Sequence, residues 1–97
     1  MISARIHVHE KERILAACDE DILGMTFRGN GAKITVSERF YGGERITEDI
    51  FIERAKSVTI MNLVGNGVVD TAVRAGLVSK DHVMIIGEVK HAQTVIM

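Results

Sequence analysis

The sequence predicts an α+β fold, in which a small, mostly antiparallel sheet built from hairpins has two helices packed on one side. Apolar and polar residues alternate near the start, and β-branched apolar runs close the chain, as is typical of strands. The middle of the chain changes to the three- and four-residue spacing of helices. The length of 97 residues, with 46% hydrophobic and 26% charged residues, predicts one folded domain over residues 1–97.

Charge and cysteine content exclude several classes of protein. The 12 Lys and Arg against 13 Asp and Glu give a net charge of -1, which excludes the strong basic field of a protein that coats nucleic acid. The single cysteine, Cys18, excludes an intramolecular disulfide and fits a reducing cytoplasm. Because no run approaches the roughly 18 apolar residues of a membrane span, we expect a cytoplasmic protein without a membrane contact.

Two hairpins are predicted in the first half of the chain. Residues 4–9 alternate in polarity and residues 13–18 form a second strand-compatible run, so together they predict an antiparallel pair. The next hairpin joins residues 26–28 to residues 33–37 through Gly29-Asn30-Gly31, a turn whose residues tolerate positive φ.

Helical spacing begins after Thr47, a suitable N-cap, and predicts a helix over residues 48–63. The β-branched residues Val58-Thr59-Ile60 suit a strand equally well, because they lose side-chain freedom in helices. A break near Ser57 is therefore the alternative.

The last third of the chain predicts one more helix and one more hairpin. The apolar spacing after Gly65-Asn66-Gly67 is typical of a shorter helix that ends at Gly76. Residues 82–86 and 91–96 are apolar, β-branched runs around a Gly-Glu pair, and they predict a third hairpin.

Five short segments occur in a distinctive order and spacing. They are Ala16-Ala17-Cys18-Asp19, Phe40-Tyr41-Gly42-Gly43-Glu44, Asn62-Leu63-Val64-Gly65, Ala75-Gly76-Leu77-Val78 and His91-Ala92-Gln93. Together they resemble an archaeal family of small proteins, domain-of-unknown-function family 424, over nearly the whole chain. The resemblance implies an archaeal, cytoplasmic, single-domain protein with a role near translation or RNA, and it carries over no catalytic residue.

One part of the sequence combines aromatic and basic residues. This set consists of Phe27, Phe40, Tyr41, Arg28, Lys33, Arg39 and Arg45. Such a mixture can stack bases and hold phosphates, so we expect RNA or a ribonucleoprotein as the partner of a small binding module. The candidate binding residues are Arg39, Tyr41, Gly42, Gly43, Arg45, His91 and Gln93.

Residues 39–45 are central to this hypothesis. If Phe40 is the buried anchor, Tyr41 faces outward for stacking, and Gly42-Gly43 bends with positive φ and exposes N–H groups to an anion. The arginines at both ends of the loop suit phosphate or carboxylate. The alternative is a plain turn, in which Tyr41 fills a satellite cluster and the loop's glutamate offsets one arginine.

A histidine face supports the alternative function of a small metal-binding or enzymatic protein. His7 and His9 project from one face of a strand, a geometry that Zn or Cu can use if His91 or a carboxylate supplies a further ligand. The sequence identifies no third ligand, so we assign no metal, no cofactor and no catalytic residue.

Two other features favour structural roles. Three acids follow Cys18 and oppose a thiolate, so we expect a small buried side chain rather than a nucleophile. Gly65-Asn66-Gly67 precedes a helix and its N–H groups suit a phosphate, but no P-loop residues follow, so a plain turn is favoured.

Asn62 and the chain end complete the structural expectations. Asn62 falls on the apolar stripe of the predicted helix, so we expect its amide to bond the turn at residues 65–67. Residues 95–97 are apolar, which predicts packing in the core or at a homodimer interface. A homodimer is therefore a candidate assembly.

Overall fold

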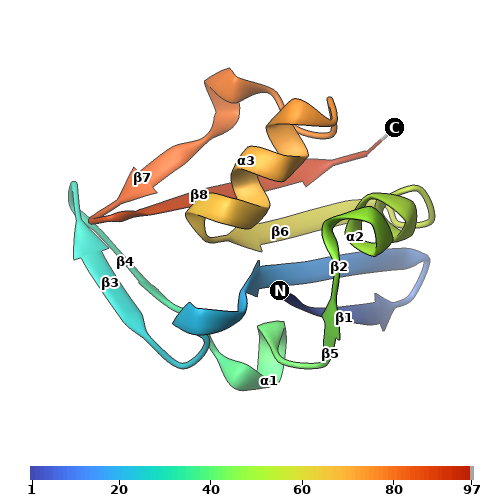
Figure 1. Cartoon of the computed structure of the whole chain (residues 1–97), viewed down its shortest axis with the longest axis horizontal. Coiled ribbons are helices and arrows are strands. Elements are labelled where there is room, and N and C mark those ends of the chain that lie inside the picture. Colours follow the sequence, from blue (N-terminus) through green and yellow to red (C-terminus); the bar gives the residue numbers. More distant parts are fainter. Residues whose placement is uncertain (97) are drawn as a thin grey trace.

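The computed structural model describes residues 1–96, which form a six-stranded sheet, a two-stranded hairpin and three α-helices (Figure 1). The strands are β1 (Ile2–His9), β2 (Glu12–Asp19), β3 (Thr26–Gly29), β4 (Ala32–Thr35), β5 (Glu44–Ile46), β6 (Ile60–Val64), β7 (Met84–Ile86) and β8 (Val89–Val95). The α-helices are α1 (Glu38–Tyr41), α2 (Glu48–Ala55) and α3 (Asn66–Arg74), and the 3-10 turns are η1 (Glu20–Ile22) and η2 (Lys80–His82). The predicted α+β class is confirmed.

The six-stranded sheet is mixed. Its strand order is β5-β1-β2-β6-β8-β7, and β2 pairs with β6 in parallel whereas the other neighbours are antiparallel. The three predicted hairpins, β1–β2, β3–β4 and β7–β8, are confirmed. The sequence missed the parallel pair because β6 lies in a segment that helical spacing assigned to a helix.

The predicted helix over residues 48–63 is wrong in its second half. It begins as expected, because the Thr47 hydroxyl accepts a hydrogen bond from the N–H of Ile50 at 3.3 Å. The first half is α2 and the last part is β6, so the alternative break near Ser57 is confirmed. Pairing with both β2 and β8 gives this β-branched segment partners on each side, and this outweighs its weak helical preference.

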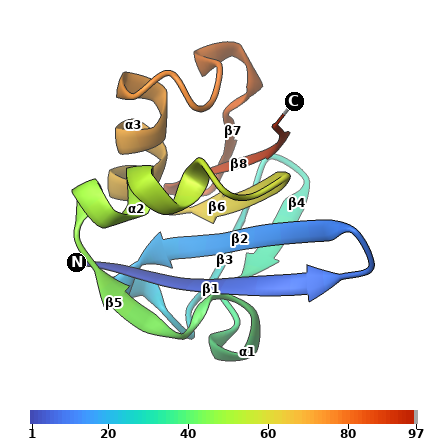
Figure 2. The same cartoon turned by 90° about the vertical axis from the view of Figure 1, so that its right-hand side faces the viewer.

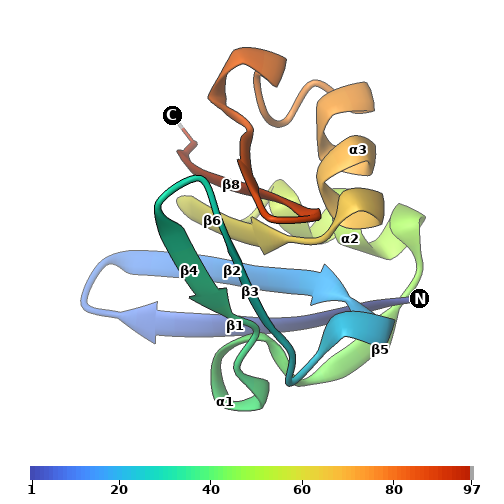
Figure 3. The ribbon, with the colours of Figure 1, turned by 90° about the vertical axis from the view of Figure 1, so that its left-hand side faces the viewer.

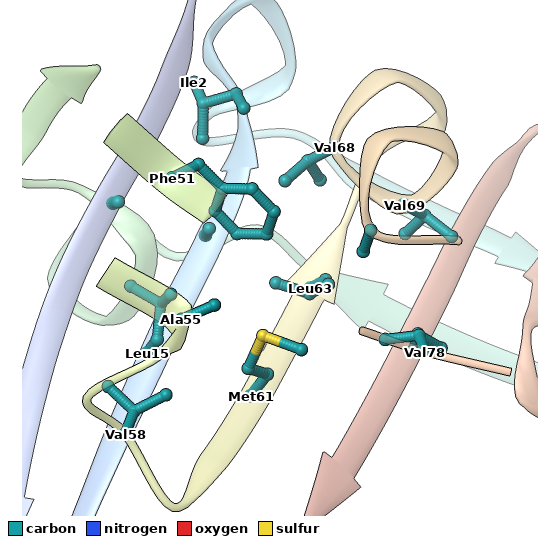
Figure 4. Packing of buried hydrophobic residues seen from close by; sticks show 14 of the residues in the cluster. Ile2, Leu15, Phe51, Ala55, Val58, Met61, Leu63, Val68, Val69 and Val78 are labelled. Carbon is teal, nitrogen blue, oxygen red and sulfur yellow. The ribbon is translucent and has the colours of Figure 1, made fainter. Parts of the chain in front are cut away.

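Helices α2 and α3 cover one face of the sheet, which we call the helix face (Figure 2). The larger core lies between them and the strands (Figure 4). Its fully buried members include Phe51, Leu15, Met61, Leu63, Val68 and Val69. Each large apolar side chain buried here stabilises the fold by roughly 1.5–3 kcal/mol, so this face provides most of the folding energy.

The opposite face, which we call the hairpin face, carries α1 and the β3–β4 hairpin (Figure 3). Side chains alternate along β2, so Leu15 belongs to the helix-face core and Ala16 to a second, smaller cluster. The buried members of that cluster are Ala16, Cys18, Val36, Tyr41, Val64, Ile86 and Val89. The prediction of two helices on one side is therefore correct for α2 and α3, and it missed α1 on the other side.

The β3–β4 hairpin is held against the sheet at its tip. The side chain of Asn30 donates a hydrogen bond to the carbonyl of Ile85 at 2.8 Å. Gly87 has a φ of +63, and a Cβ there would lie 2.6 Å from the carbonyl oxygen of Arg28, so only glycine allows the two turns to meet. This anchoring fixes the hairpin across the sheet.

The end of the chain is only partly packed. Ile96 packs against the helix-face core, and its N–H donates to the carbonyl of Thr59 at 2.7 Å. Val95 is 65% exposed, so it does not pack in the core, and its packing at a homodimer interface stays a prediction. Met97, which belongs to the same prediction, lies outside the described residues.

Within residues 1–96, no helix has both the length and the apolar character needed to cross a membrane.

Candidate functional site

The predicted binding loop, residues 39–45, begins as a helical turn. The Ser37 hydroxyl oxygen accepts hydrogen bonds from the N–H groups of Arg39 and Phe40 at 3.1 and 3.3 Å, which caps α1. Successive helical residues point about 100° apart, so neighbouring side chains face different surroundings. Arg39 is exposed, Phe40 is half-buried and Tyr41 is buried.

Tyr41, the last residue of α1, is 4% exposed and packs in the hairpin-face cluster. Its hydroxyl donates a hydrogen bond to Oδ1 of Asn62 at 2.5 Å. Burial, followed by the nearby Cys18, raises the pKa of Tyr41 to about 12. The predicted roles of Phe40 and Tyr41 were therefore wrong, because the buried hydroxyl finds an amide partner while Phe40 lies at the rim. The alternative is confirmed for Tyr41, which packs in a satellite cluster, and is wrong for Glu44, which pairs with Arg54 rather than with an arginine of the loop.

His7 and Phe40 form a stacked pair at the edge of α1. Their ring centroids are 4.6 Å apart with an interplanar angle of 13°. Because a carbonyl only accepts, His7 Nε2 carries the hydrogen that is donated to the carbonyl of Phe40 at 2.7 Å. The other ring nitrogen of a neutral His7, Nδ1, is then a hydrogen-bond acceptor. The half-buried rings of His7 and Phe40 therefore offer both an aromatic surface and a polar atom.

Polar side chains continue from this pair across β6 and β8. Asn62 lies directly opposite Gln93, so the amide predicted on a helix stands on a strand and bonds Tyr41 rather than the turn at residues 65–67. His91 points to the same face as Gln93, and its Nδ1 donates to the carbonyl of Leu63 at 2.9 Å. The structure thus brings His91 and Gln93 onto the face that carries Tyr41.

The glycines of the predicted loop are needed for close packing. Neither Gly42 nor Gly43 has a positive φ, so that expectation was wrong. A Cβ on Gly42 would overlap the carbonyl of Glu38, and one on Gly43 would overlap the carbonyl of Ala4. These contacts give both glycines a packing role.

Arg45 lies apart from Arg39. It belongs to β5, the edge strand beside β1, and its guanidinium is paired with the carboxylate of Glu20. The two arginines therefore do not flank one open loop, and Arg45 already has an anionic partner.

The histidines of the metal hypothesis are separated in space. His7 and His9 share the hairpin face of β1, as predicted, but His91 is on β8, with β2 and β6 between them. Three strand spacings amount to about 14 Å, which is too far for one metal ion. Among residues 1–96, no group of three or more His, Cys, Asp or Glu side chains is placed to hold a metal.

Cys18 and the glycine turn before α3 both have structural roles. Cys18 is fully buried, and burial, then the charges of Asp19 and Asp21, raises the pKa of its thiol to about 12. A thiol protonated at neutral pH is a poor nucleophile. The anion-binding turn is occupied by the chain itself, because the Asp19 carboxylate accepts from the N–H groups of Gly67 and Val68 at 2.8 Å each.

The two faces differ in how their cations are neutralised. Around α2 and α3, basic residues form four ion pairs, Arg54–Glu44, Lys56–Glu53, Arg74–Glu48 and Lys90–Asp70. On the hairpin side, the exposed residues Arg28, Lys33 and Arg39 have no carboxylate within 4.0 Å in the described part of the chain. This side therefore has cations available to an external anion.

Arg28 and Lys33 form a cross-strand pair that the sequence analysis did not place among its binding residues. They lie directly opposite each other, while Phe27 and Ile34 point inward from the same hairpin. The pairing follows from a two-residue turn at Asn30 and Gly31, both with positive φ. The Asn-Gly pair in the sequence was the signal that could have predicted this register.

These features define the protein as a small α+β domain with a packed helix face and a half-covered hairpin face that exposes unpaired cations within the described residues. The chain belongs to the DUF424 family, described as "Protein of unknown function (DUF424)", whose model matches residues 6–97. The predicted family resemblance is confirmed.

The fold also has a counterpart among solved structures. The chain is similar to a crystal structure of an uncharacterized conserved protein from Methanopyrus kandleri, with a TM-score of 0.84 and 28% sequence identity. The match covers 99% of this chain and 91% of that chain. No curated protein matches the sequence.

Proposed function

We propose that the hairpin face binds single-stranded RNA. The observation that carries the proposal is the contrast in ion pairing, because Arg28, Lys33 and Arg39 lack carboxylate partners in the described chain while Arg54 on α2 and Arg74 on α3 have them. Phosphate groups are the anions that such a set of cations would attract.

The pair of Arg28 and Lys33 supports an anionic ligand most directly. Like charges directly opposite on two strands destabilise a hairpin. Both side chains are exposed and point away from the sheet, so nothing on the protein requires two cations there. A bound phosphate would turn this repulsion into two favourable contacts.

The sheet itself offers groups that contact bases. A base stacked on an aromatic ring contributes about 1–3 kcal/mol, and the stacked rings of His7 and Phe40 are half-exposed at the rim of the face. The exposed amide of Gln93 can donate to and accept from a base edge. Unpaired bases present these edges, whereas an RNA duplex hides them, so the proposal is for a single strand.

The net charge of -1 limits the expected affinity to what the local cations provide. With three phosphates neutralised, the logarithm of affinity should fall with the logarithm of salt concentration with a slope of about -2. Binding of this kind is modest and sensitive to salt.

The test is a titration of labelled RNA of about 12 nucleotides, a length within the range of single-strand sites, followed by fluorescence anisotropy. We expect the double variant Arg28→Gln/Lys33→Gln to weaken binding by about tenfold or more and to reduce the magnitude of the salt slope by about 1.4, the share of two of the three cations. Phe40→Leu should weaken binding with an unchanged slope, because it removes stacking and leaves the charges.

The matched control is Lys56→Gln/Arg74→Gln, which also removes two cations but from the helix face. It should leave affinity within about twofold, and thermal unfolding monitored by circular dichroism would verify that all variants fold. Equal losses in the two double variants would show that only net charge matters, and no binding by the parent protein would exclude the proposal.

A further inference from the structure

A cleft of about 420 Å³ lies on the helix side of the molecule, at the far edge from α2. Residues of α3 form one wall of the cleft, and residues from η2 to β7 form the other; Figure 1 shows the course of these segments. Its lining consists of Val69, Asp70, Val73, Arg74, Lys80, Val83, Ile85 and Lys90. Nothing in the RNA proposal uses these residues.

The lining separates into an apolar part and a charged part. Val73, Val83 and Ile85 provide branched aliphatic surface, and Val69, also in the lining, is fully buried. Ile85 is 54% exposed, so its side chain adds apolar surface to the cleft. A ligand that covers it would remove this apolar surface from water.

The charged part is predominantly basic. Three cations and one carboxylate line the cleft, although the whole protein has a net charge of -1. Lys90 is bridged to Asp70 at 2.6 Å, and Arg74 lies 3.5 Å from the carboxylate of Glu48. Lys80 has no carboxylate within 4.0 Å in the described chain, so it is the cation available to a ligand.

We propose that this cleft binds a small organic anion with an aliphatic body, whose carboxylate or related group meets Lys80 while its chain covers Ile85 and the valines. The size falls in the range of about 300–1,000 Å³ that small-molecule sites occupy. Charge selects the sign of the ligand, and the apolar wall requires a hydrocarbon part, so a free inorganic anion would satisfy only half of the site.

The probe is hexanoate, titrated into the ¹⁵N-labelled protein and followed by amide chemical shifts in two-dimensional NMR. Hexylammonium, with an aliphatic chain of similar length and the opposite charge, is the matched ligand control. We expect saturable shifts from hexanoate at Val73, Lys80, Val83 and Ile85, and little change from hexylammonium. Unsaturable shifts, shifts scattered over the surface, or equal effects from both compounds would overturn the proposal.

Two pairs of variants divide the site into its parts. Lys80→Gln should weaken hexanoate by about tenfold, the loss expected for one charge-assisted contact, whereas Lys56→Gln should not. Ile85→Glu should abolish the saturable shifts. Ile50→Glu, which changes an exposed isoleucine outside the cleft, on α2, should preserve them. An unchanged hexanoate affinity in both cleft variants would also overturn the proposal. Neither outcome bears on the RNA proposal, because none of the cleft residues belongs to the hairpin face.

Discussion

The two faces of the sheet differ in packing and in charge. Within residues 1–96, the helix-face core contains 15 buried residues and the cations on α2 and α3 are paired, whereas the hairpin-face cluster contains 7 and exposes partner-free cations above it. The first arrangement is what a chain needs to stay folded. The second leaves side chains whose replacement costs little stability, and such positions are where binding can be altered separately from folding.

The largest difference between the faces should come from Phe51→Ala. Phe51 is fully buried on the helix face, so its truncation should lower the free energy of unfolding by about 3–5 kcal/mol. Phe40→Ala, at the rim of the hairpin face, should cost less than about half as much because the site already meets solvent. Urea unfolding curves of both variants measure this, and equal costs would contradict the contrast.

Alkaline unfolding should reveal the buried acids of the hairpin-face cluster. The pKa of Cys18 is raised from 9.0 to about 12, and that of Tyr41 from 10.0 to about 12. The unfolded chain releases these protons first, so their contribution to stability is complete below pH 9 and is lost as the pH rises to about 12. Unfolding of Cys18→Ala/Tyr41→Phe should depend less steeply on pH in that window, and a slope identical to the parent's would be evidence against this origin.

Asp19→Ala should have an intermediate effect on stability, because the side chain of Asp19 links β2 to the start of α3. Its carboxylate accepts from two N–H groups at the start of the helix, and losing such a cap costs about 1–2 kcal/mol. Asp21→Ala removes the same charge from an exposed position two residues away and should cost about 0.5 kcal/mol or less. If chemical denaturation shows equal effects, general electrostatics rather than capping explains them.

The smallest effect on stability is expected from Tyr41→Phe. The variant keeps the ring and loses the hydrogen bond to Asn62, so the cost should be about 0.5–1.5 kcal/mol. RNA affinity should stay within about twofold, because the hydroxyl is buried below the proposed surface. A large loss of RNA binding in a stable variant would instead show that Tyr41 contacts the RNA.

Local patterns predicted the hairpins and the starts of α2 and α3, but not α1. The Asn30-Gly31 turn and the Thr47 cap act over a few residues, so their signals are visible in the sequence. The second half of the predicted helix failed because its structure depends on β2, a strand distant in sequence. Spacing within a segment does not encode such partners.

The candidate site was predictable only in part. The sequence identified the aromatic and basic residues, but the choice between Phe40 and Tyr41 depended on Asn62, which lies 21 residues further along the chain. The pairing of Arg45 with Glu20 likewise joins distant segments. Neither contact leaves a periodic pattern, and so the exposed members of the set could be recognised only from the fold.

The most direct test of the proposed RNA surface is to map where a single strand lies. Unlabelled RNA of about 12 nucleotides, titrated into ¹⁵N-labelled protein at low salt, should shift the amides of His7, Arg28, Lys33 and Gln93 progressively. Amides of α2 and α3 should remain in place, and raising the salt concentration should reverse the shifts. Shifts concentrated on α2 and α3, or none at any RNA concentration, would contradict the assignment of RNA binding to the hairpin face.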